Sequence, residues 1–260
     1  MDSAPLALGP LIASLLIVAA AGVVRGFAGF GFSALSVAGL SLMVSPARVV
    51  PAIFMLEILA SLSLLRSAWR DIDWPWLSWL ALGNALCIPL GIALLAWLPE
   101  TPLRLLIGLL LLAAAVLLRA GLSVGLAPTR GVRLATGLVS GFVNGVAAIG
   151  GIAVAVLLST TQMPPAKMRA TMIALFLFTD LYALVWAGLL TLGGQAHGPL
   201  LGASTLNLAL WLTPPMLLGI WIGQRAFSGV SPQGFRQHVL NLLALISTLT
   251  VTRALVDLLS

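Results

Sequence analysis

Residues 25–33 read RGFAGFGFS, and residues 140–151 read SGFVNGVAAIGG. Each run joins two apolar stretches through glycines, with no polar loop between them. Glycine lets the backbone turn sharply because it has no Cβ to clash. The two runs therefore predict helices that break within an apolar environment.

The residues around these runs are typical of a membrane protein. Of 260 residues, 60% are apolar and 8% are charged, and the mean hydropathy is +1.13, well above that of soluble domains. A membrane helix needs roughly 20 apolar residues, so the chain has room for about ten segments and no soluble domain. The net charge of +6 is expected in cytoplasmic loops. No compact basic run with interleaved aromatics occurs, so we predict no nucleic-acid partner.

Ten apolar segments are predicted, and the second, sixth and seventh are short. Each glycine run either lies inside one broken helix that crosses once, or joins two elements that turn back as a hairpin. The ten predicted segments span residues 6–24, 29–44, 47–66, 76–98, 103–122, 132–146, 150–160, 168–190, 200–223 and 237–257.

The basic residues favour the hairpins. Eight crossings would place six basic residues on each side of the membrane, whereas ten elements place ten on one side and only Arg48, Arg104 and Arg253 on the other. Cytoplasmic loops carry such an excess. We therefore expect both termini to be periplasmic, and the Ala, Leu, Arg and Trp bias indicates a bacterial inner (plasma) membrane. The first apolar stretch follows no positively charged region, which predicts a retained helix.

Short motifs recur in the same order in both halves of the chain, residues 1–125 and 126–260. Five elements per half is an odd number, so the second half is expected to be inverted relative to the first. Inverted repeats with glycine-interrupted segments are typical of secondary transporters with a site near the midplane. The recurring motifs are Gly26-Phe27 with Gly141-Phe142, Pro46-Ala47-Arg48 with Pro165-Ala166-Lys167, and Leu90-Gly91-Ile92 with Leu218-Gly219-Ile220.

In residues 26–32, and in Gly141-Phe142, Asn144-Gly145 and Ile149-Gly150-Gly151, the chain resembles the sulfite exporter TauE/SafE family. Members have two related halves, each opening with a glycine-rich, Gly-Phe-containing turn and a following proline. The resemblance covers nearly the whole chain, although Phe32-Ser33-Ala34 replaces three glycines usual in the family. It implies transport of sulfite, organosulfonates or related small anions.

Backbone N–H groups at a broken helix can bind an anion, aided by the helix dipole. Alternatively, the glycines only allow close helix packing. Arg25 either holds the anion through charge-assisted hydrogen bonds or is an ordinary cytoplasmic anchor. The candidate contacts besides Arg25 are Gly29, Gly31, Ser33, Asn144, Gly145, Gly150 and Gly151.

Two acids lie deep in apolar segments, where each needs a partner, a proton or water. Glu57 and Asp180 are therefore proton-coupling candidates, the alternative being a structural role. Three aromatic residues of the first run are either gates or packing residues: Phe27, Phe30 and Phe32.

Four further polar residues are weaker candidates for function. Asn84 and Asn207 are secondary candidates at or near membrane depth. His197 and His238 have no second ligand nearby, so we predict no metal site.

The sequence predicts an all-α transporter working by alternating access with a small anion and the bilayer as partners. No GxSxG, HExxH or paired Asp motif occurs, so we predict no enzymatic activity and no cofactor. The alternatives are a membrane scaffold or assembly factor, and an anion channel. No oligomeric state is predicted.

Overall fold

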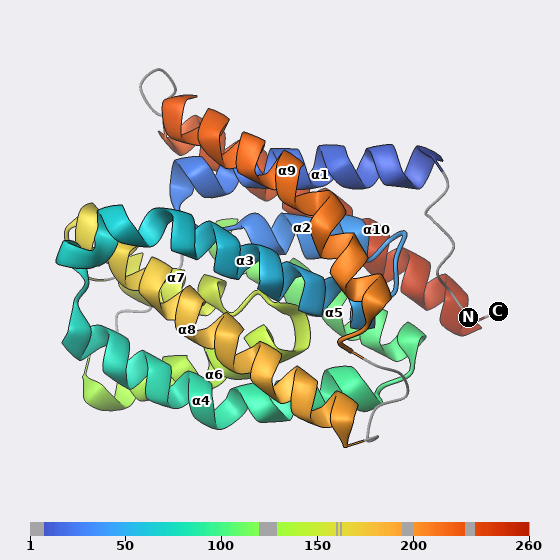
Figure 1. Cartoon of the computed structure of the whole chain (residues 1–260), viewed down its shortest axis with the longest axis horizontal. Helices are drawn as coiled ribbons and strands as arrows, with labels where there is room; N and C mark the ends of the chain where they lie inside the picture. Colours follow the sequence, from blue (N-terminus) through green and yellow to red (C-terminus); the bar gives the residue numbers. More distant parts are fainter. Residues whose placement is uncertain are drawn as a thin grey trace.

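The computed structural model describes residues 8–119, 129–159, 161, 163–193, 200–226 and 232–259. Within these residues all regular structure is helical, which confirms the predicted class (Figure 1). The elements are α1 (Leu8–Ala28), α2 (Phe32–Leu40), α3 (Pro46–Ala68), the 3-10 helix η1 (Trp69–Asp71), α4 (Trp74–Trp97), α5 (Glu100–Arg119), α6 (Arg130–Ala147), α7 (Gly151–Ser159), α8 (Pro165–Leu192), α9 (Ala203–Ala226) and α10 (Pro232–Leu259).

The chain contains long apolar helices and two very short ones, which follow α1 and α6. Among the described residues, six helices are long and apolar enough to cross a membrane, namely α1, α3, α4, α5, α8 and α9. The two shortest α-helices of the described residues, α2 and α7, have nine residues each. Each of them directly follows a glycine run, so the prediction of a short second and a short seventh element is confirmed. The sixth element is also predicted to be short, but α6 is longer, with 18 residues.

The first break lies later than predicted. The sequence places the end of the first segment at residue 24, but α1 continues through Arg25 to Ala28. The backbone then turns at Gly29 and Gly31, whose φ angles of 80° and 92° are readily adopted only without a Cβ. At the second break, Ala148 adopts a φ of 57°, and its N–H donates to the Asn144 carbonyl at 2.7 Å.

Glycines bring two pairs of helices into backbone contact. A Cβ on Gly145 of α6 would lie 2.6 Å from the Ile88 carbonyl oxygen of α4. A Cβ on Gly22 of α1 would lie 2.6 Å from the Met216 carbonyl oxygen of α9. Small residues allow such close approach between membrane helices. At these two crossings the glycines allow close helix packing.

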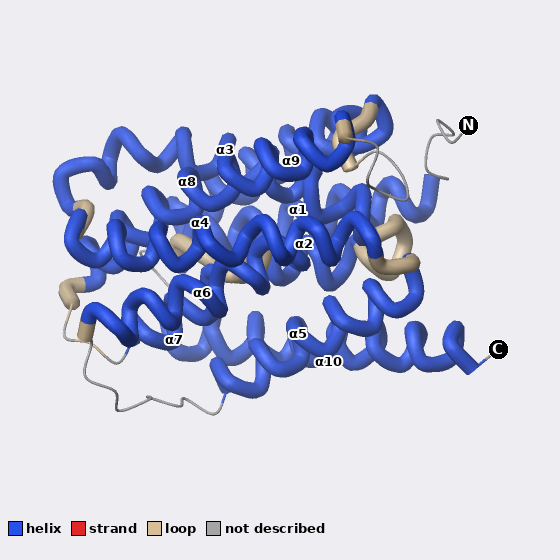
Figure 2. Tube along the Cα trace, turned by 90° about the horizontal axis from the view of Figure 1, so that it is seen from below, coloured by secondary structure: helices blue, strands red, loops and turns tan. Residues whose placement is uncertain are grey.

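The packing partners follow a regular exchange (Figures 1 and 2). Helix α1 packs on α9 and α6 packs on α4, while α3 pairs with α8 and α5 with α10. A two-fold axis that relates α1–α5 to α6–α10 would produce these pairs. It would map the contact between α1 and α9 onto the contact between α6 and α4, and it would map the other two pairs onto themselves. The division at residues 125 and 126, and the inverted orientation, stay predictions.

The positions of the helix ends separate the ten-element alternative from the eight-crossing one. Asp73, just after η1, donates its N–H to Thr171 Oγ1 of α8 at 3.0 Å, so Arg70 and Lys167 lie at the same end. At the other end, Arg104 lies 3.7 Å from Asp257. With eight crossings, Arg70 and Lys167 would lie on opposite sides of the membrane, and so would Arg104 and Asp257. In Figures 1 and 2, the start of α1 and the end of α10 also lie at one end.

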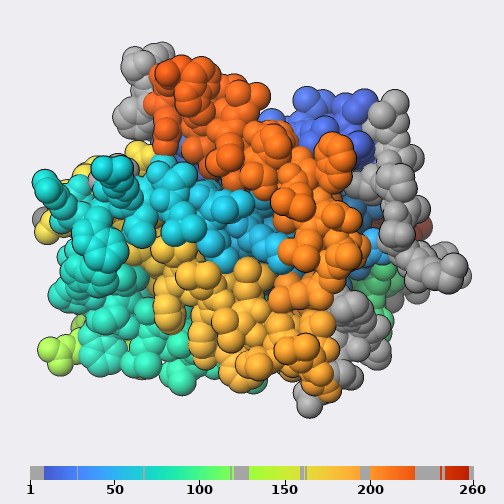
Figure 3. Space-filling model, viewed as in Figure 1, coloured from blue at the N-terminus to red at the C-terminus, as the bar shows by residue number. Residues whose placement is uncertain are grey.

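The outer surface is apolar. Side chains of α3, α8 and α9 close the face seen in Figure 3. Such a surface suits contact with lipid tails, whereas the charged side chains of Arg25, Glu57 and Asp180 are buried inside the helix bundle. Large exposed apolar side chains of these three helices include Leu59, Leu62, Leu181, Val185, Leu189, Leu206, Leu210, Trp211 and Trp221.

Candidate substrate site at the two helix breaks

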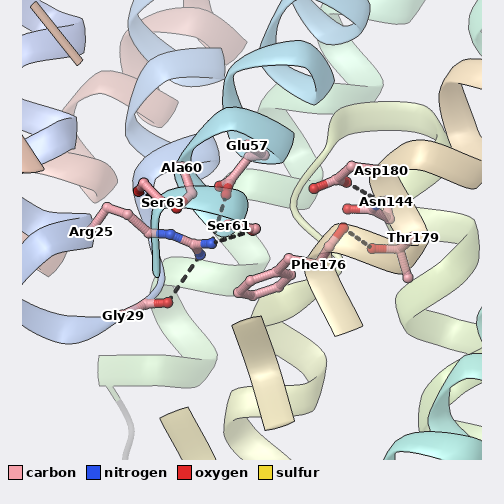
Figure 4. Close-up of polar contacts among 10 residues, drawn as sticks. All are labelled: Arg25, Gly29, Glu57, Ala60, Ser61, Ser63, Asn144, Phe176, Thr179 and Asp180. Atoms are coloured by element: carbon pink, nitrogen blue, oxygen red, sulfur yellow. Dashed lines mark hydrogen bonds and ion pairs between the residues drawn. The ribbon is translucent and has the colours of Figure 1, made fainter. Parts of the chain in front are cut away.

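Arg25 is fully buried, with 0% of its surface exposed. It occupies the last turn of α1, where its Nη1 donates to the Gly29 carbonyl at 3.0 Å. Its Nη2 donates to Ser61 Oγ at 3.0 Å and lies 3.0 Å from Glu57 Oε2 (Figure 4). A buried, paired guanidinium differs from the solvated side chain that a cytoplasmic anchor usually presents.

The face of this guanidinium is covered by an aromatic ring from another helix. Phe176 of α8 places its ring centroid 4.6 Å from Arg25 Cζ, which is within cation–π range. Figure 4 shows the ring reaching Arg25 from the side opposite Glu57. Helices α1, α3 and α8 therefore meet at one charged side chain.

Helix α3 supplies both the acid and the hydroxyl. Glu57 and Ser61 are four residues apart, so they lie on one face of the helix. Glu57 is buried, and its Oε2 contacts Arg25 as an ion pair without hydrogen-bond geometry. Removing ions from water costs several kcal/mol each, and a buried pair recovers this only in part.

The second break carries a similar arrangement, with the uncharged amide of Asn144 in the place of the Arg25 guanidinium. Asn144 near the end of α6 donates its Nδ2 to Asp180 Oδ1 of α8 at 3.0 Å. Its Oδ1 accepts the Gly150 N–H at 3.3 Å. Asn144 and Asp180 are both buried, so one amide side chain ties the break between α6 and α7 to a membrane-depth acid.

The two breaks match when positions 119 residues apart are compared. This spacing pairs Arg25 with Asn144 and Ser61 with Asp180, and both hydrogen bonds span 36 residues. It also pairs the left-handed residues Gly29 and Ala148. The motif match of Gly26 with Gly141 uses a spacing of 115, and the ends of α1 and α6 show that 119 is the better register.

The remaining predicted contacts surround the breaks in different ways. Gly31 precedes α2, and Ser33 in its first turn is half-buried. Gly151 lies against the Phe176 ring, so a Cβ there would clash with it. Gly150 uses its N–H for Asn144, whereas Gly145 sits inside α6 at the crossing with α4.

The three phenylalanines of the first run flank its glycines, and the two asparagines lie elsewhere. Phe27 and Phe32 are buried and Phe30 is half-buried. Asn84 accepts the Ser140 hydroxyl at the crossing of α4 and α6, and Asn207 is exposed.

Neither histidine adds a site that the structure describes. His197, like the side chain of His238, lies outside the described residues. The described part of the chain holds no group of three side chains suited to a metal ion.

Sequence reasoning missed two members of the cluster, Ser61 and Phe176. The spacing of 119 between Pro46 and Pro165 relates Glu57 to Phe176 in the sequence, but it does not show that Phe176 covers Arg25. The same spacing relates Ser61 to Asp180, which would have marked Ser61 as a member of the site. The assembled site offers a guanidinium, two acids and an amide in a buried setting. Such a set can bind an anion and exchange a proton.

These features define a polytopic membrane protein with a buried polar site between two broken helices. The chain belongs to the sulfite exporter TauE/SafE family, whose family model matches residues 14–250. It is therefore a member of a family of membrane transporters. No curated protein and no solved structure matches the chain.

Proposed function

We propose that this protein is a secondary transporter of small sulfur-containing anions, such as sulfite and organosulfonates, across a bacterial plasma membrane. The observation that carries the proposal is Arg25, a fully buried guanidinium beside a helix break. A charge at membrane depth is expensive and usually serves a substrate or ion pathway. A structural scaffold needs no such group.

The chemistry of the breaks suits an oxyanion. A guanidinium presents planar donors that match sulfite or sulfonate oxygens. The first turn of α2, after Gly31, adds unpaired backbone N–H groups and the positive end of its dipole. In this proposal Gly29 and Ser33 complete the contacts around Arg25, while Asn144, Gly150 and Gly151 form the matching part at α7.

The anion and Glu57 compete for Arg25. When Glu57 takes up a proton it releases the guanidinium, and a monovalent anion then restores the same local charge. The proton and the anion therefore move together. Asp180 is the second acid of this coupling, because it lies within electrostatic range of both Glu57 and Arg25.

The contact between α3 and α8, one helix from each half, supports alternating access. The two halves rock about this pair, and Phe27, Phe30 and Phe32 close the path in turn. The end carrying Arg70 and Lys167 faces the cytoplasm, and both termini are periplasmic. An ion pair that must open and reclose in each cycle favours a carrier over a channel or a scaffold.

Thermal unfolding of the detergent-purified protein tests the proposal. A ligand stabilises the folded state by an amount that grows with its concentration relative to Kd. Sulfite or a sulfonate is expected to raise Tm, with acetate and choline as reference ions. Arg25→Gln should abolish that shift and Lys167→Gln should keep it. An unchanged shift in Arg25→Gln, or no shift with any anion, contradicts the proposal.

A further inference from the structure

Arg169, near the start of α8, lies beside the first break. It is one of the ten basic residues that the charge pattern places on the cytoplasmic side. Its stem packs on Gly29, where an added Cβ would lie 3.0 Å from Arg169 Cγ and 3.4 Å from its Nε. The carbonyl of Gly29 accepts Arg25 Nη1 at 3.0 Å. One residue of the break therefore separates two guanidinium side chains.

Both of these side chains have a donor without an acceptor. The Nε atoms of Arg169 and Arg25 are buried, and neither has a hydrogen-bond partner within the described part of the chain. Buried donors are rarely left unpaired in native proteins, because the lost hydration is not replaced. Two such donors at one break point to a shared ligand rich in acceptors.

The charged groups around the first break leave one guanidinium, that of Arg169, without an acidic partner among the described residues. Glu57 is engaged with Arg25 at 3.0 Å, and Asp180 is held by Asn144. Among the residues that the structure describes, no acid forms an ion pair with Arg169. Arg25 and Arg169 are close enough to repel each other, and an anion between them would relieve that repulsion.

Helix α8 lines up Arg169 with the rest of the site. Phe176 follows Arg169 by seven residues and Asp180 follows Phe176 by four, which places all three on one face of the helix. Phe176 meets Arg25 at 4.6 Å and Asp180 meets Asn144 at 3.0 Å. The same face therefore runs from the end with the basic residues to both breaks.

We infer that Arg169 is a substrate-binding residue, which holds an oxyanion at Gly29 together with Arg25. The inference rests on the proposed anion transport and adds a second guanidinium to its site. Two guanidinium forks require several oxygens around one central atom, as in sulfite or a sulfonate. A halide offers no such set, so the pair also sets specificity.

Lys167 provides the matched control. It lies two residues before Arg169 on the same helix and is exposed. A basic residue that only anchors the helix at the membrane surface would behave like Lys167. A substrate-binding residue would not.

The test is calorimetric titration of the full-length protein in lipid nanodiscs, with sulfite as the ligand and chloride as the halide. Arg169→Gln is expected to raise the Kd for sulfite about tenfold or more, because it removes charge-assisted hydrogen bonds. Arg169→Lys should also weaken sulfite, since it keeps the charge and loses the fork. Lys167→Gln should bind as the wild type does.

The outcomes separate this inference from the proposed function. If Arg169→Gln binds sulfite with the wild-type Kd and Arg25→Gln does not bind it, the role of Arg169 is overturned and the proposed function stands. An absence of sulfite binding in the wild type overturns both proposals. If Arg169→Gln fails to fold, Arg169→Lys decides, and a wild-type Kd there overturns the inference.

Discussion

Arg25 and Glu57 form a buried ion pair whose two charges each lose several kcal/mol of hydration. Hydrophobic residues of similar volume would fill the same space at lower cost. Ser61 Oγ and the Gly29 carbonyl accept two hydrogen bonds from the guanidinium. These bonds hold the guanidinium in place when the ion pair with Glu57 opens. The pair is therefore suited to opening and closing around a ligand.

Replacing Glu57 tests the proton coupling. In the wild type, ionised Glu57 competes for Arg25, so the affinity for methanesulfonate is expected to fall as pH rises, by up to about tenfold per unit for one linked proton. Glu57→Gln cannot ionise, and its affinity should stay nearly constant with pH. Calorimetric titration over a pH series measures both slopes, and methanesulfonate keeps its charge throughout.

A matched acid shows whether the effect is specific. Glu100 pairs with Arg104 near the molecular surface, and Glu100→Gln should leave the pH slope unchanged. A wild-type slope in Glu57→Gln would move the coupling away from Glu57. Asp180→Asn then identifies whether the second acid carries the proton.

At the scale of helices, the crossing of α4 and α6 fixes the second break. Gly145→Ala places a Cβ 2.6 Å from the Ile88 carbonyl oxygen, which cannot move away without shifting α4. The expected cost is about 1–3 kcal/mol, as for other overpacked sites, measured as a lower Tm. The N–H is retained, so the Kd for sulfite should change little.

Gly188 is the control for that variant. It lies inside α8, and an added Cβ there would make ordinary contact with Leu201 Cδ1 at 3.5 Å. Gly188→Ala should keep the wild-type Tm. A raised Kd in Gly145→Ala with an unchanged Tm would instead return Gly145 to the binding site.

The helical elements were predictable because apolar length and glycine punctuation act locally. Residues 29–31 and 148–150 are breaks in the structure, and both lie within or beside the quoted glycine runs. The end of α1 was misplaced, since Gly26 looks like a turn residue in sequence but packs on α9. The contact is with a helix almost 200 residues away, so the residues next to Gly26 do not indicate it.

The composition of the site was only partly predictable for a related reason. Arg25, Glu57, Asn144 and Asp180 stand out as polar groups at membrane depth. Which of them meet depends on how α1, α3, α6 and α8 rotate about their axes. An apolar helix in lipid has no strong hydrophobic face to reveal that rotation, so the Arg25–Glu57 and Asn144–Asp180 pairs required the structure.

For the whole molecule, the grouping of charges predicts how it sits in the membrane. Arg70 and Lys167 share one end, and Arg104 lies at the other beside Asp257. The end richer in basic residues is expected in the cytoplasm. Exposed residues at the two ends should therefore differ in their access from outside the cell.

Cysteine labelling measures that difference. In a Cys87→Ser background, Asp71→Cys and Glu100→Cys place one thiol at each end. A membrane-impermeant maleimide should label the cysteine at position 100 in intact cells, and the cysteine at position 71 only after permeabilisation. The reverse pattern would show that the protein has the opposite orientation in the membrane. Equal labelling in intact cells would contradict the placement of positions 71 and 100 at opposite ends.

The central claim is that buried Arg25 binds the transported anion, and uptake of radiolabelled sulfite into proteoliposomes tests it most directly. With an inward proton gradient, the wild type and Lys167→Gln are expected to accumulate sulfite, and Arg25→Gln to remain at the level of empty liposomes although it inserts and folds. Uptake by Arg25→Gln at the wild-type rate would contradict the account.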